Sequence, residues 1–413
     1  MTTATARVVD LALRAPYYRE KLRDWALHPS WDTLPFTTKD DLRAAYPFGL
    51  LATSREGIAS YHESSGTSGE PTPTFFTEPD WDDIASRFAR NAVALCPTDT
   101  VLIKTPYSMV TTAHQMHRAA RMKGALVIPA DNRCSNMPYS KVIRLLKDLS
   151  VTVVWCMPFE ALIWAAAAAA HGLDPRTDFP ALRAFVVAGE PVGPAKKQRI
   201  QEIWGARVFE DYGSTETGSL AGDCESGNLH AWTDRLLYEV VDPDTQQVSL
   251  EGVGLLAITP LFREAQPLLR YLVGDRVEIR SNACACGSEF PVIRVLGREE
   301  SGVRLGEAVV FPSRIEEAVF QLPRSHEVVF WRARVTPEPM GLEVEIECPE
   351  QHQAEASSAL ASRLRDELRL PARVRGVMPG TIFPSKFFTE TYRLLKPRYV
   401  FAAGEDWDKA SPY

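Results

Sequence analysis

The sequence lacks apolar runs of membrane-spanning length. Its alanine-rich segment at residues 165–170 is far shorter than the roughly 20 apolar residues that a transmembrane helix needs. The first ten residues also lack the apolar core of a signal peptide. We therefore expect a protein that is neither inserted in a membrane nor secreted.

An excess of positive charge is also missing. Lysine and arginine total 46, aspartate and glutamate total 53, and the formal net charge is −7. This balance argues against a nucleic-acid partner and, more mildly, against an anionic membrane surface. Cysteine is sparse, and seven residues, an odd number, are scattered along the chain. Such usage is typical of reduced thiols in a cytoplasmic protein rather than of a disulfide framework.

What the chain does contain is enough apolar sequence for more than one core. Its 413 residues are 45% hydrophobic, and a chain of this length usually divides into two or three domains. Short apolar strands are expected at residues 101–104, 125–128, 151–156, 184–187 and 207–209, and helices at 80–95, 139–149, 160–171 and 194–204. This alternation predicts an α/β fold with a buried, mainly parallel sheet covered by helices.

A smaller part is expected at the carboxyl end. Residues 229–280 have a β-like pattern, and residues 297–413 alternate helices with short strands, among them 328–331 and 342–347. We expect residues 1–296 to form a large domain and 297–413 a small α+β domain. A hinge is expected near residues 298–300.

Residues 64–74 combine hydroxyl side chains with glycine. Gly66 and Gly69 stand among six hydroxyl residues, and Pro71 and Pro73 prevent a helix. Because glycine has no Cβ, its backbone can approach a ligand closely and direct N–H groups at phosphate oxygens. The Gly-Lys-Ser/Thr ending of a Walker loop does not follow. The segment is therefore either a phosphate-binding loop or a serine- and glycine-rich surface loop.

Three further motifs follow this loop. They are residues 211–218 (Asp-Tyr-Gly-Ser-Thr-Glu-Thr-Gly), 270–275 (Arg-Tyr-Leu-Val-Gly-Asp) and 297–300 (Gly-Arg-Glu-Glu). Together with residues 64–74, and in this order, they resemble the adenylate-forming superfamily of acyl-CoA synthetases, most closely its phenylacetate–CoA ligase branch. The resemblance spans nearly the whole chain. It implies a large domain of parallel sheets with a distorted β-barrel, followed by a small, mobile α+β domain.

The resemblance implies an enzyme that activates a carboxylic acid with ATP and Mg²⁺ and transfers the acyl group from the adenylate to a thiol. Coenzyme A and the phosphopantetheine of an acyl carrier protein are both candidate acceptors, and a homodimer is one candidate assembly. Two alternatives stay open. One is an adenylating enzyme with a non-thiol acceptor, such as an amine in specialised biosynthesis. The other is a degenerate homologue that binds a nucleotide without catalysis.

The resemblance also assigns roles in a nucleotide site. Thr215 would contact the α-phosphate, Glu216 would bind Mg²⁺ as a hard oxygen ligand, and Asp275 would accept hydrogen bonds from the ribose hydroxyls. The other expected nucleotide-binding residues are Ser65, Gly66, Thr67, Ser68, Gly69, Gly189, Glu190, Asp211, Tyr212, Gly213 and Arg298. Two positions depart from the family pattern: Glu70 stands where lysine is frequent, and Val273 where threonine is usual.

Flat and adaptable apolar side chains occur in two segments, residues 107–117 and 155–159. They predict an acyl pocket that suits an aromatic acid. Its expected lining residues are Tyr107, Met109, His117, Trp155, Met157, Phe159 and Tyr212. His117 matches a histidine of phenylacetate–CoA ligases and would contact the substrate or its carboxylate. A purely structural histidine is the alternative.

Four residues resemble a zinc site found in part of this branch: Cys224, His230, Cys284 and Cys286. Three thiolates and one imidazole make a closed tetrahedral set with no open position for catalysis. The expected zinc is therefore structural.

The family places a catalytic lysine near the end of its small domain, usually after a glycine and shortly before an arginine. Lys396 is the candidate here, although no glycine precedes it. Lys386 and Arg393 are alternatives, and arginine would keep the charge but not the compact geometry of lysine. Loss of this role would leave a slow or altered enzyme.

Overall fold

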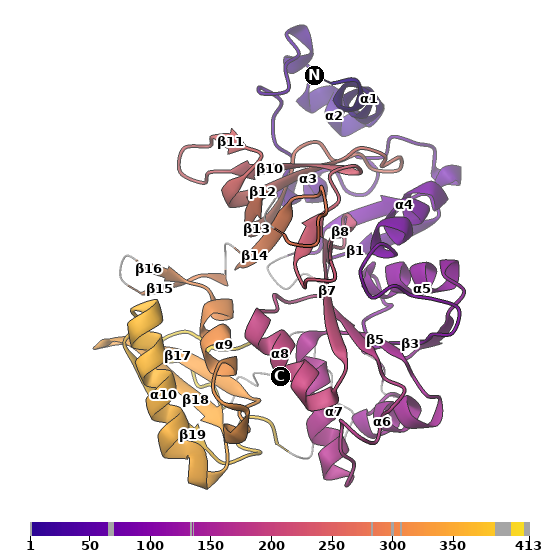
Figure 1. Cartoon of the computed structure of the whole chain (residues 1–413). Helices are drawn as coiled ribbons and strands as arrows, with labels where there is room; N and C mark the ends of the chain where they lie inside the picture. The colour runs from indigo at the N-terminus through magenta and orange to yellow at the C-terminus, as the bar shows by residue number, and fades with distance from the viewer. Residues whose placement is uncertain are drawn as a thin grey trace. The chain divides into compact units, whose positions relative to one another are not determined.

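The chain folds into two compact units, each assembled from two stretches of sequence. In the computed structural model (Figure 1), one unit contains Met1–Pro129 and Phe209–Glu300, and the other contains Ala130–Val208 and Ser301–Tyr413. The structure describes residues 2–408 except 65–69, 133, 135, 282–283, 299–300, 306–307 and 385–397. The expected division into domains 1–296 and 297–413 stays a prediction.

Helices and short 3-10 turns form the amino-terminal part of the first unit. They are α1 (Thr3–Ala12), α2 (Pro16–Lys21), η1 (Trp25–Leu27), α3 (Lys39–Ala44), η2 (Arg55–Gly57), α4 (Glu78–Phe88) and α5 (Thr112–Met122). Helices α3 and α4 begin at capping boxes, in which Thr38 and Thr77 pair with Asp41 and Asp80. Each box satisfies N–H groups that the first helical turn would otherwise leave without partners.

Helix α4 is shorter than the sequence predicts. The expected helix spans residues 80–95, but α4 ends at Phe88. The side-chain amide of Asn91 donates to the carbonyl of Glu210 (2.8 Å), and its oxygen accepts the N–H two residues further on. These bonds stabilise a turn, and Ala94 follows with a left-handed φ of 48°, a conformation that a helix of L-residues avoids.

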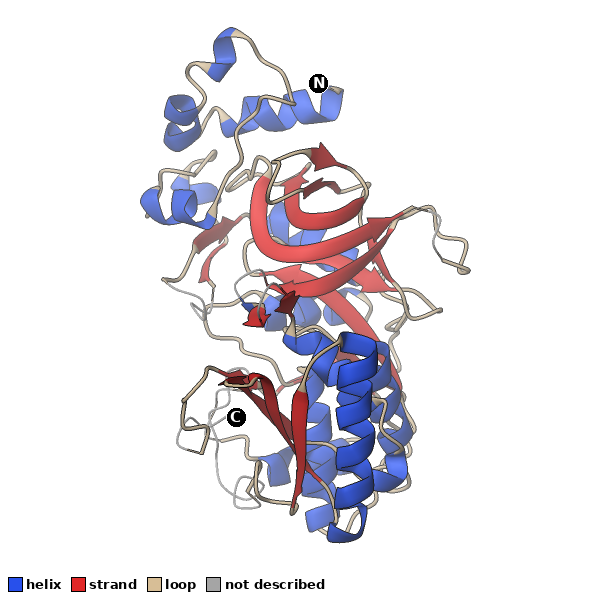
Figure 2. Ribbon diagram, turned by 90° about the vertical axis from the view of Figure 1, so that its left-hand side faces the viewer, coloured by secondary structure: helices blue, strands red, loops and turns tan. Residues whose placement is uncertain are grey.

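Antiparallel strands form most of the first unit. In spatial order they are β11 (Val248–Ser249), β10 (Leu236–Val241), β12 (Gly252–Pro260), β13 (Tyr271–Arg280), β14 (Val292–Arg298), β9 (Leu229–Ala231), β8 (Gly218–Asp223) and β7 (Arg207–Ser214). Register shifts occur in the pairings of β12 with β13 and of β13 with β14, and such bulges bend a sheet. Figure 2 shows these strands strongly curved. The distorted barrel-like region expected at residues 229–280 is therefore present.

Two smaller strand pairs complete the first unit. Strands β1 (Ser60–Glu63) and β2 (Pro73–Phe76) are antiparallel, and the predicted phosphate loop lies between them in the sequence. Strands β3 (Thr100–Ile103) and β4 (Leu126–Pro129) are parallel and are connected by α5. This is the strand–helix–strand connection that the alternating pattern predicts.

The first part of the second unit continues that alternation. Its elements are α6 (Tyr139–Asp148), β5 (Val153–Cys156), α7 (Pro158–Ala170), β6 (Ala184–Val187) and α8 (Pro194–Trp204). Strands β5 and β6 are parallel and fully buried, which explains their continuous apolar sequence. Helix α7 carries the alanine run, and most of its residues are buried. Small alanine side chains allow this close packing.

The second part of this unit contains a four-stranded sheet with helices. Its elements are β15 (Val303–Leu305), β16 (Ala308–Val310), α9 (Pro312–Phe320), η4 (Arg324–His326), β17 (Trp331–Pro337), β18 (Met340–Glu347), α10 (Glu350–Leu368), β19 (Ala372–Val377) and β20 (Val400–Phe401). The sheet order is β19-β18-β17-β20, and α10 packs on it, as Figure 2 shows. This is the α+β arrangement that the sequence predicts for the carboxyl-terminal segment.

One strand of this sheet starts later than predicted. A strand is expected near 328–331, and the structure has one, β17, that begins three residues later, at Trp331. Glu327 has a left-handed φ of 55°, and the carbonyl of Val328 accepts a hydrogen bond from the guanidinium of Arg199 (2.7 Å). A side chain thus takes the bond that a strand neighbour would make. Within the described part of the chain, none of the helices is both long enough and apolar enough to cross a membrane.

Candidate functional site

The turn between β7 and β8 carries Thr215 and Glu216. Thr215 is half-buried, and Glu216 is only 4% exposed. The Glu216 carboxylate accepts a hydrogen bond from the hydroxyl of Thr72, and its backbone carbonyl accepts one from Arg263 (2.6 Å). Because a buried carboxylate needs hydrogen-bond donors or a cation, this side chain suits a hard cation such as Mg²⁺.

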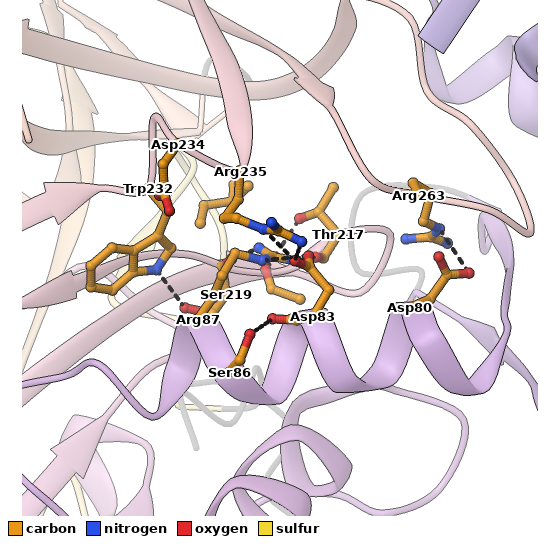
Figure 3. Close-up of polar contacts among 12 residues, drawn as sticks. Asp80, Asp83, Ser86, Arg87, Thr217, Ser219, Trp232, Asp234, Arg235 and Arg263 are labelled. Carbon is orange, nitrogen blue, oxygen red and sulfur yellow. Dashed lines mark hydrogen bonds and ion pairs between the residues drawn. The ribbon is translucent and has the colours of Figure 1, made fainter. Parts of the chain in front are cut away.

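A buried arginine holds the same turn by its backbone. Figure 3 shows Arg87, on α4, donating to the carbonyls of Thr217 and Ser219. The Nε of Arg87 also pairs with Asp83 (2.9 Å), one helical turn earlier, and Asp83 pairs with Arg235 (2.5 Å). Helix α4 therefore fixes the backbone just after the predicted magnesium ligand.

Glycine is required by the geometry of this motif. A Cβ on Gly213 would lie 2.3 Å from the carbonyl oxygen of Gly218, and Gly218 itself has a φ of 67° with Ile84 packed against it. Asp211, at the start of the motif, is 2% exposed and accepts a hydrogen bond from the hydroxyl of Ser219 (2.6 Å). Burial raises the pKa of Asp211 well above its usual value. Asp211 and Gly213 thus shape the turn, and their contact with a nucleotide stays a prediction.

Asp275 lies on the buried face of strand β13, and the neighbouring side chains on that face are apolar. The hydroxyl of Tyr212 donates to Oδ2 of Asp275 (2.6 Å), and Nε of Arg298 lies 2.8 Å from Oδ1. Burial and the Asp275 charge raise the pKa of Tyr212 well above its usual value, so the hydroxyl keeps its proton and donates it. Residues predicted from three separate motifs therefore meet at one carboxylate.

A pocket of about 780 Å³ in the first unit contains Tyr107, Met109 and His117. Other lining side chains include His62, Trp81 and His114, with Glu78, Arg118 and Arg121 as charged members. The hydroxyl of Tyr107 lies 3.1 Å from Nδ1 of His117. Burial, together with His114, lowers the pKa of His117 and brings that of His62 to about 4. Neutral imidazoles and aromatic rings give this pocket flat walls.

In the second unit, Glu190 belongs to a buried charge cluster. Its Oε1 accepts hydrogen bonds from the N–H of Phe159 (3.1 Å) and from Nζ of Lys196 (2.9 Å). Nζ of Lys196 also bonds Oε1 of Glu316 (2.9 Å), and the hydroxyl of Tyr399 lies near both Lys196 and Glu190. Glu190 thus has a structural partner, while its expected place beside the adenine stays a prediction.

The other predicted residues of the second unit lie at or near strand ends. Gly189 has a φ of 93°, and Met157 packs where its Cβ would be. Met157 and Phe159 are 5% and 2% exposed, and Trp155 is completely buried. Trp155 therefore belongs to the apolar core of this unit, and a role of these side chains as pocket walls stays a prediction.

Several predicted residues lie outside the described part of the chain. They are Ser65, Gly66, Thr67, Ser68 and Gly69 of the phosphate loop, the catalytic candidate Lys396, and its alternatives Lys386 and Arg393. Their roles stay predictions.

The four predicted zinc ligands converge. One ligand atom from each of Cys224, His230, Cys284 and Cys286 lies within 4.8 Å of all the others. The sulfurs of Cys224 and Cys284 are 3.6 Å apart, and Nε2 of His230 is 3.4 Å from the sulfur of Cys286. Nδ1 of His230 lies 2.7 Å from the carbonyl of Phe290, the outer contact that usually orients a metal-binding imidazole. The donor set and its spacing fit tetrahedral zinc.

No role was predicted from the sequence for four side chains that support the site, although one of them, Thr72, lies in the hydroxyl-rich segment 64–74. Thr72 and Arg263 contact Glu216, Arg87 holds the following backbone, and Lys196 pairs with Glu190. Only Arg87 had a local signal, because it lies four residues after Asp83 on one helix. The other contacts join segments that are distant in sequence or unmarked by any motif.

Comparisons with known proteins agree with this description. A family model described as "AMP-binding enzyme" matches residues 50–257. The phenylacetate–coenzyme A ligase of Thermus thermophilus is 31% identical over 353 residues, which cover 81% of this chain and 78% of that protein. The phenylacetate–coenzyme A ligase of Pseudomonas putida is 29% identical, with coverage of 77% and 74%. A crystal structure of 2-hydroxyisobutyryl-CoA ligase in the postadenylation state superposes with a TM-score of 0.83, at 24% identity, over 96% of this chain and 88% of that chain.

The fold is that of the adenylate-forming enzymes. The chain belongs to the AMP-binding enzyme family, and within it to the branch that contains the phenylacetate–CoA ligases. It is an AMP-forming acid–thiol ligase, which activates a carboxylic acid with ATP as an acyl-adenylate and passes the acyl group to a thiol. These relatives do not favour a non-thiol acceptor or a non-catalytic homologue.

Proposed function

We propose that this ligase activates an aromatic carboxylic acid and transfers it to coenzyme A. The pocket of about 780 Å³ carries the proposal, because Tyr107, His117 and Trp81 give it flat, largely uncharged walls. Its volume lies within the usual range for sites that enclose a small molecule. The printed names of the relatives, phenylacetate–coenzyme A ligases, support the same acid class and acceptor.

For the nucleotide, Asp275 is the proposed ribose ligand. Its two oxygens face Tyr212 and Arg298, and this geometry suits recognition of two adjacent hydroxyl groups. Thr215 is the proposed α-phosphate contact, and Arg298 is the residue proposed to hold the Asp275 carboxylate in position beside the sugar. The phosphate loop at residues 65–69 and the motif residues Asp211 and Gly213 complete the proposed site in this unit, and a nucleotide contact of Gly189 and Glu190 stays a prediction.

Glu216 is the proposed magnesium ligand. Its carboxylate is buried, held on one side by Thr72, and fixed in position through Arg263. Bound Mg²⁺ would neutralise the phosphate charge that develops as pyrophosphate leaves. Lys396, or Lys386 or Arg393 in its place, would add positive charge from the carboxyl-terminal segment during adenylation.

Cys224, His230, Cys284 and Cys286 are the proposed ligands of a structural zinc ion. Bound zinc would link the segments that carry these residues and supply folding energy rather than chemistry. We further propose a cytoplasmic enzyme, on the basis of its seven scattered cysteines, an odd number that does not suit a disulfide framework. The phosphopantetheine of an acyl carrier protein is the alternative acceptor to free coenzyme A. A homodimer is the proposed candidate assembly.

The test is a screen of aryl and short-chain carboxylic acids by pyrophosphate release, followed by thioester formation with coenzyme A or with a phosphopantetheinylated carrier protein. Aryl acids and coenzyme A should give the highest kcat/KM. Preference for a short aliphatic acid would contradict the aromatic assignment, and preference for the carrier protein would contradict the acceptor.

The metal role is tested in the same assay. Glu216→Ala should abolish acid-dependent ATP–pyrophosphate exchange, whereas Glu251→Ala, at an exposed turn acid, should leave it unchanged. A folded Glu216→Ala enzyme with normal exchange would contradict the assignment.

A further inference from the structure

A second group of potential metal ligands lies in the carboxyl-terminal part of the second unit. His326, His352 and Glu355 each offer one ligand atom, and these atoms lie within 4.8 Å of one another. None of the three belongs to an adenylation motif or to the cysteine cluster, which lies in the first unit. From this geometry we propose a binding site for a divalent first-row transition metal ion.

The fold fixes two of these residues on one helix face. His352 and Glu355 lie three residues apart in α10, so their side chains project from the same side of the helix. His326 is the last residue of η4, and its N–H donates to the carbonyl of Pro323 (3.0 Å). The imidazole rings of His326 and His352 lie 5.5 Å apart between centroids. Two elements therefore bring three ligands to one place.

His326 is the least expected member, because its polar ring is 3% exposed. Its Nδ1 has no hydrogen-bond partner among the described residues. Its Nε2 lies 3.5 Å from Oε2 of Glu355, which is longer than an ordinary N–H···O hydrogen bond. A buried imidazole is thus left without a good partner while it faces a carboxylate. A cation bound between Nε2 and the carboxylate would give these two atoms a partner, and Nδ1 would keep its proton.

The ligand types favour a particular class of ion. Imidazole nitrogen is a preferred ligand for zinc, nickel, cobalt and copper, whereas magnesium and calcium prefer oxygen-only sites. Two histidines and one carboxylate resemble the ligand number of zinc sites that keep a fourth position for water. The present spacing is wider than a metal site requires, and Glu355, whose side chain is 74% exposed, is free to swing inward to close it.

Metal binding here would have a structural consequence. One ion would connect η4, which follows α9, to the first turn of α10. Because the ion binds the folded arrangement and not the unfolded chain, it would stabilise this part of the protein by an amount that rises with the logarithm of its free concentration above the Kd. The inference does not depend on the proposed acid or acceptor.

The test uses the full-length chain, stripped of metal with a chelator and titrated with Co²⁺. Cobalt bound by thiolates gives intense near-ultraviolet charge-transfer bands, whereas cobalt bound by imidazole and carboxylate gives only weak visible bands. We expect wild-type protein to bind Co²⁺ with the second signature, separately from any thiolate signal. His352→Ala and Glu355→Gln should each weaken that binding at least about tenfold and leave the thiolate signal unchanged.

His28→Ala, at an exposed histidine of the first unit, is the matched control and should change nothing. His352 is half-buried and Glu355 exposed, so both variants should fold, and metal-free melting curves that match wild type would verify this. The proposal is overturned if wild type shows no cobalt signal of the imidazole type. It is overturned equally if that signal survives unchanged in both variants.

Discussion

At the scale of single residues, Asp275 shows how this sequence places a charge on an apolar strand face. The carboxylate is 6% exposed and is held by the hydroxyl of Tyr212 and the guanidinium of Arg298. A hydrogen bond to a charged group contributes about 1.5–3 kcal/mol. These partners therefore orient the carboxylate before any sugar binds.

Tyr212→Phe tests that orientation. The change removes one donor to Asp275 and keeps the ring, so we expect the KM for ATP in pyrophosphate exchange to rise by roughly 10- to 100-fold. Tyr238→Phe is the matched control, because its hydroxyl donates to the carbonyl of Leu220, and there we expect a loss of stability without a change in the KM for ATP. An unchanged KM in Tyr212→Phe would show that Asp275 needs no help from this hydroxyl.

Glu316 provides a pH dependence at the same scale. Burial raises the pKa of Glu316 to about 7, although Lys196 opposes the shift. Because the folded pKa lies above the unfolded value of about 4.3, this group stabilises the fold fully below the unfolded pKa. That stability is lost as the pH rises toward 7. In Glu316→Gln the free energy of unfolding should therefore fall less steeply between these values, by roughly 3–4 kcal/mol, as measured by urea denaturation at a series of pH values. Parallel pH profiles of variant and wild type would contradict the shifted pKa.

At the scale of elements, helix α4 positions the turn that follows β7. Arg87 lies on this helix and donates to the carbonyls of Thr217 and Ser219 (Figure 3). Arg87→Met would leave two buried carbonyls and Asp83 without this donor, so we expect a loss of about 2–4 kcal/mol of stability. The kcat of exchange should also fall, by more than about tenfold, because the Glu216 turn is no longer fixed.

A charge-pair control separates these effects. Arg90→Met, in the turn that follows the same helix, removes a surface pair with Asp234 and should cost less than about 1 kcal/mol. If Arg87→Met loses stability but keeps its exchange kcat at a temperature where it is folded, Arg87 supports the fold and does not position the turn.

Helices and strands could be predicted from the sequence where neighbouring residues alone determine where they begin and end. Strand β6 and helix α8 have the bounds expected, because the first is a continuous apolar run and the second lies between Pro194 and Gly205. The predictions failed where a distant side chain takes a backbone bond. Asn91 ends α4 through Glu210, and Arg199 binds the carbonyl of Val328.

The candidate site divides in the same way. Motif residues such as Glu216 and Asp275 could be identified from the sequence, because the motifs that contain them follow one another in the same order as in the adenylate-forming enzymes. The contacts of Glu216 with Thr72 and Arg263 could not, because Thr72, although it lies in the segment 64–74, precedes Glu216 by 144 residues and Arg263 follows it by 47. Only the folded chain brings such residues together.

At the scale of the whole molecule, the cysteine cluster ties together distant parts of the first unit. Cys224 and His230 flank the turn between β8 and β9, and Cys284 and Cys286 lie between β13 and β14. A bound zinc ion would therefore cross-link connections that are about 60 residues apart. Its free energy of binding would become free energy of folding for the curved antiparallel sheet.

We expect the purified protein to contain zinc, and Cys286→Ser to lose it. Since each kcal/mol lost lowers the melting temperature of a unit of this size by about 2–4 °C, Tm should fall by roughly 5–10 °C. Cys96→Ser, at a thiol outside the cluster, should keep both the zinc and the Tm. The loss of zinc and the fall in Tm can be distinguished from effects at the His326 site, because Cys286→Ser should leave the imidazole-type cobalt signal intact. A zinc-free protein in which Cys286→Ser melts like wild type would contradict both the zinc assignment and a stabilising role of this thiol.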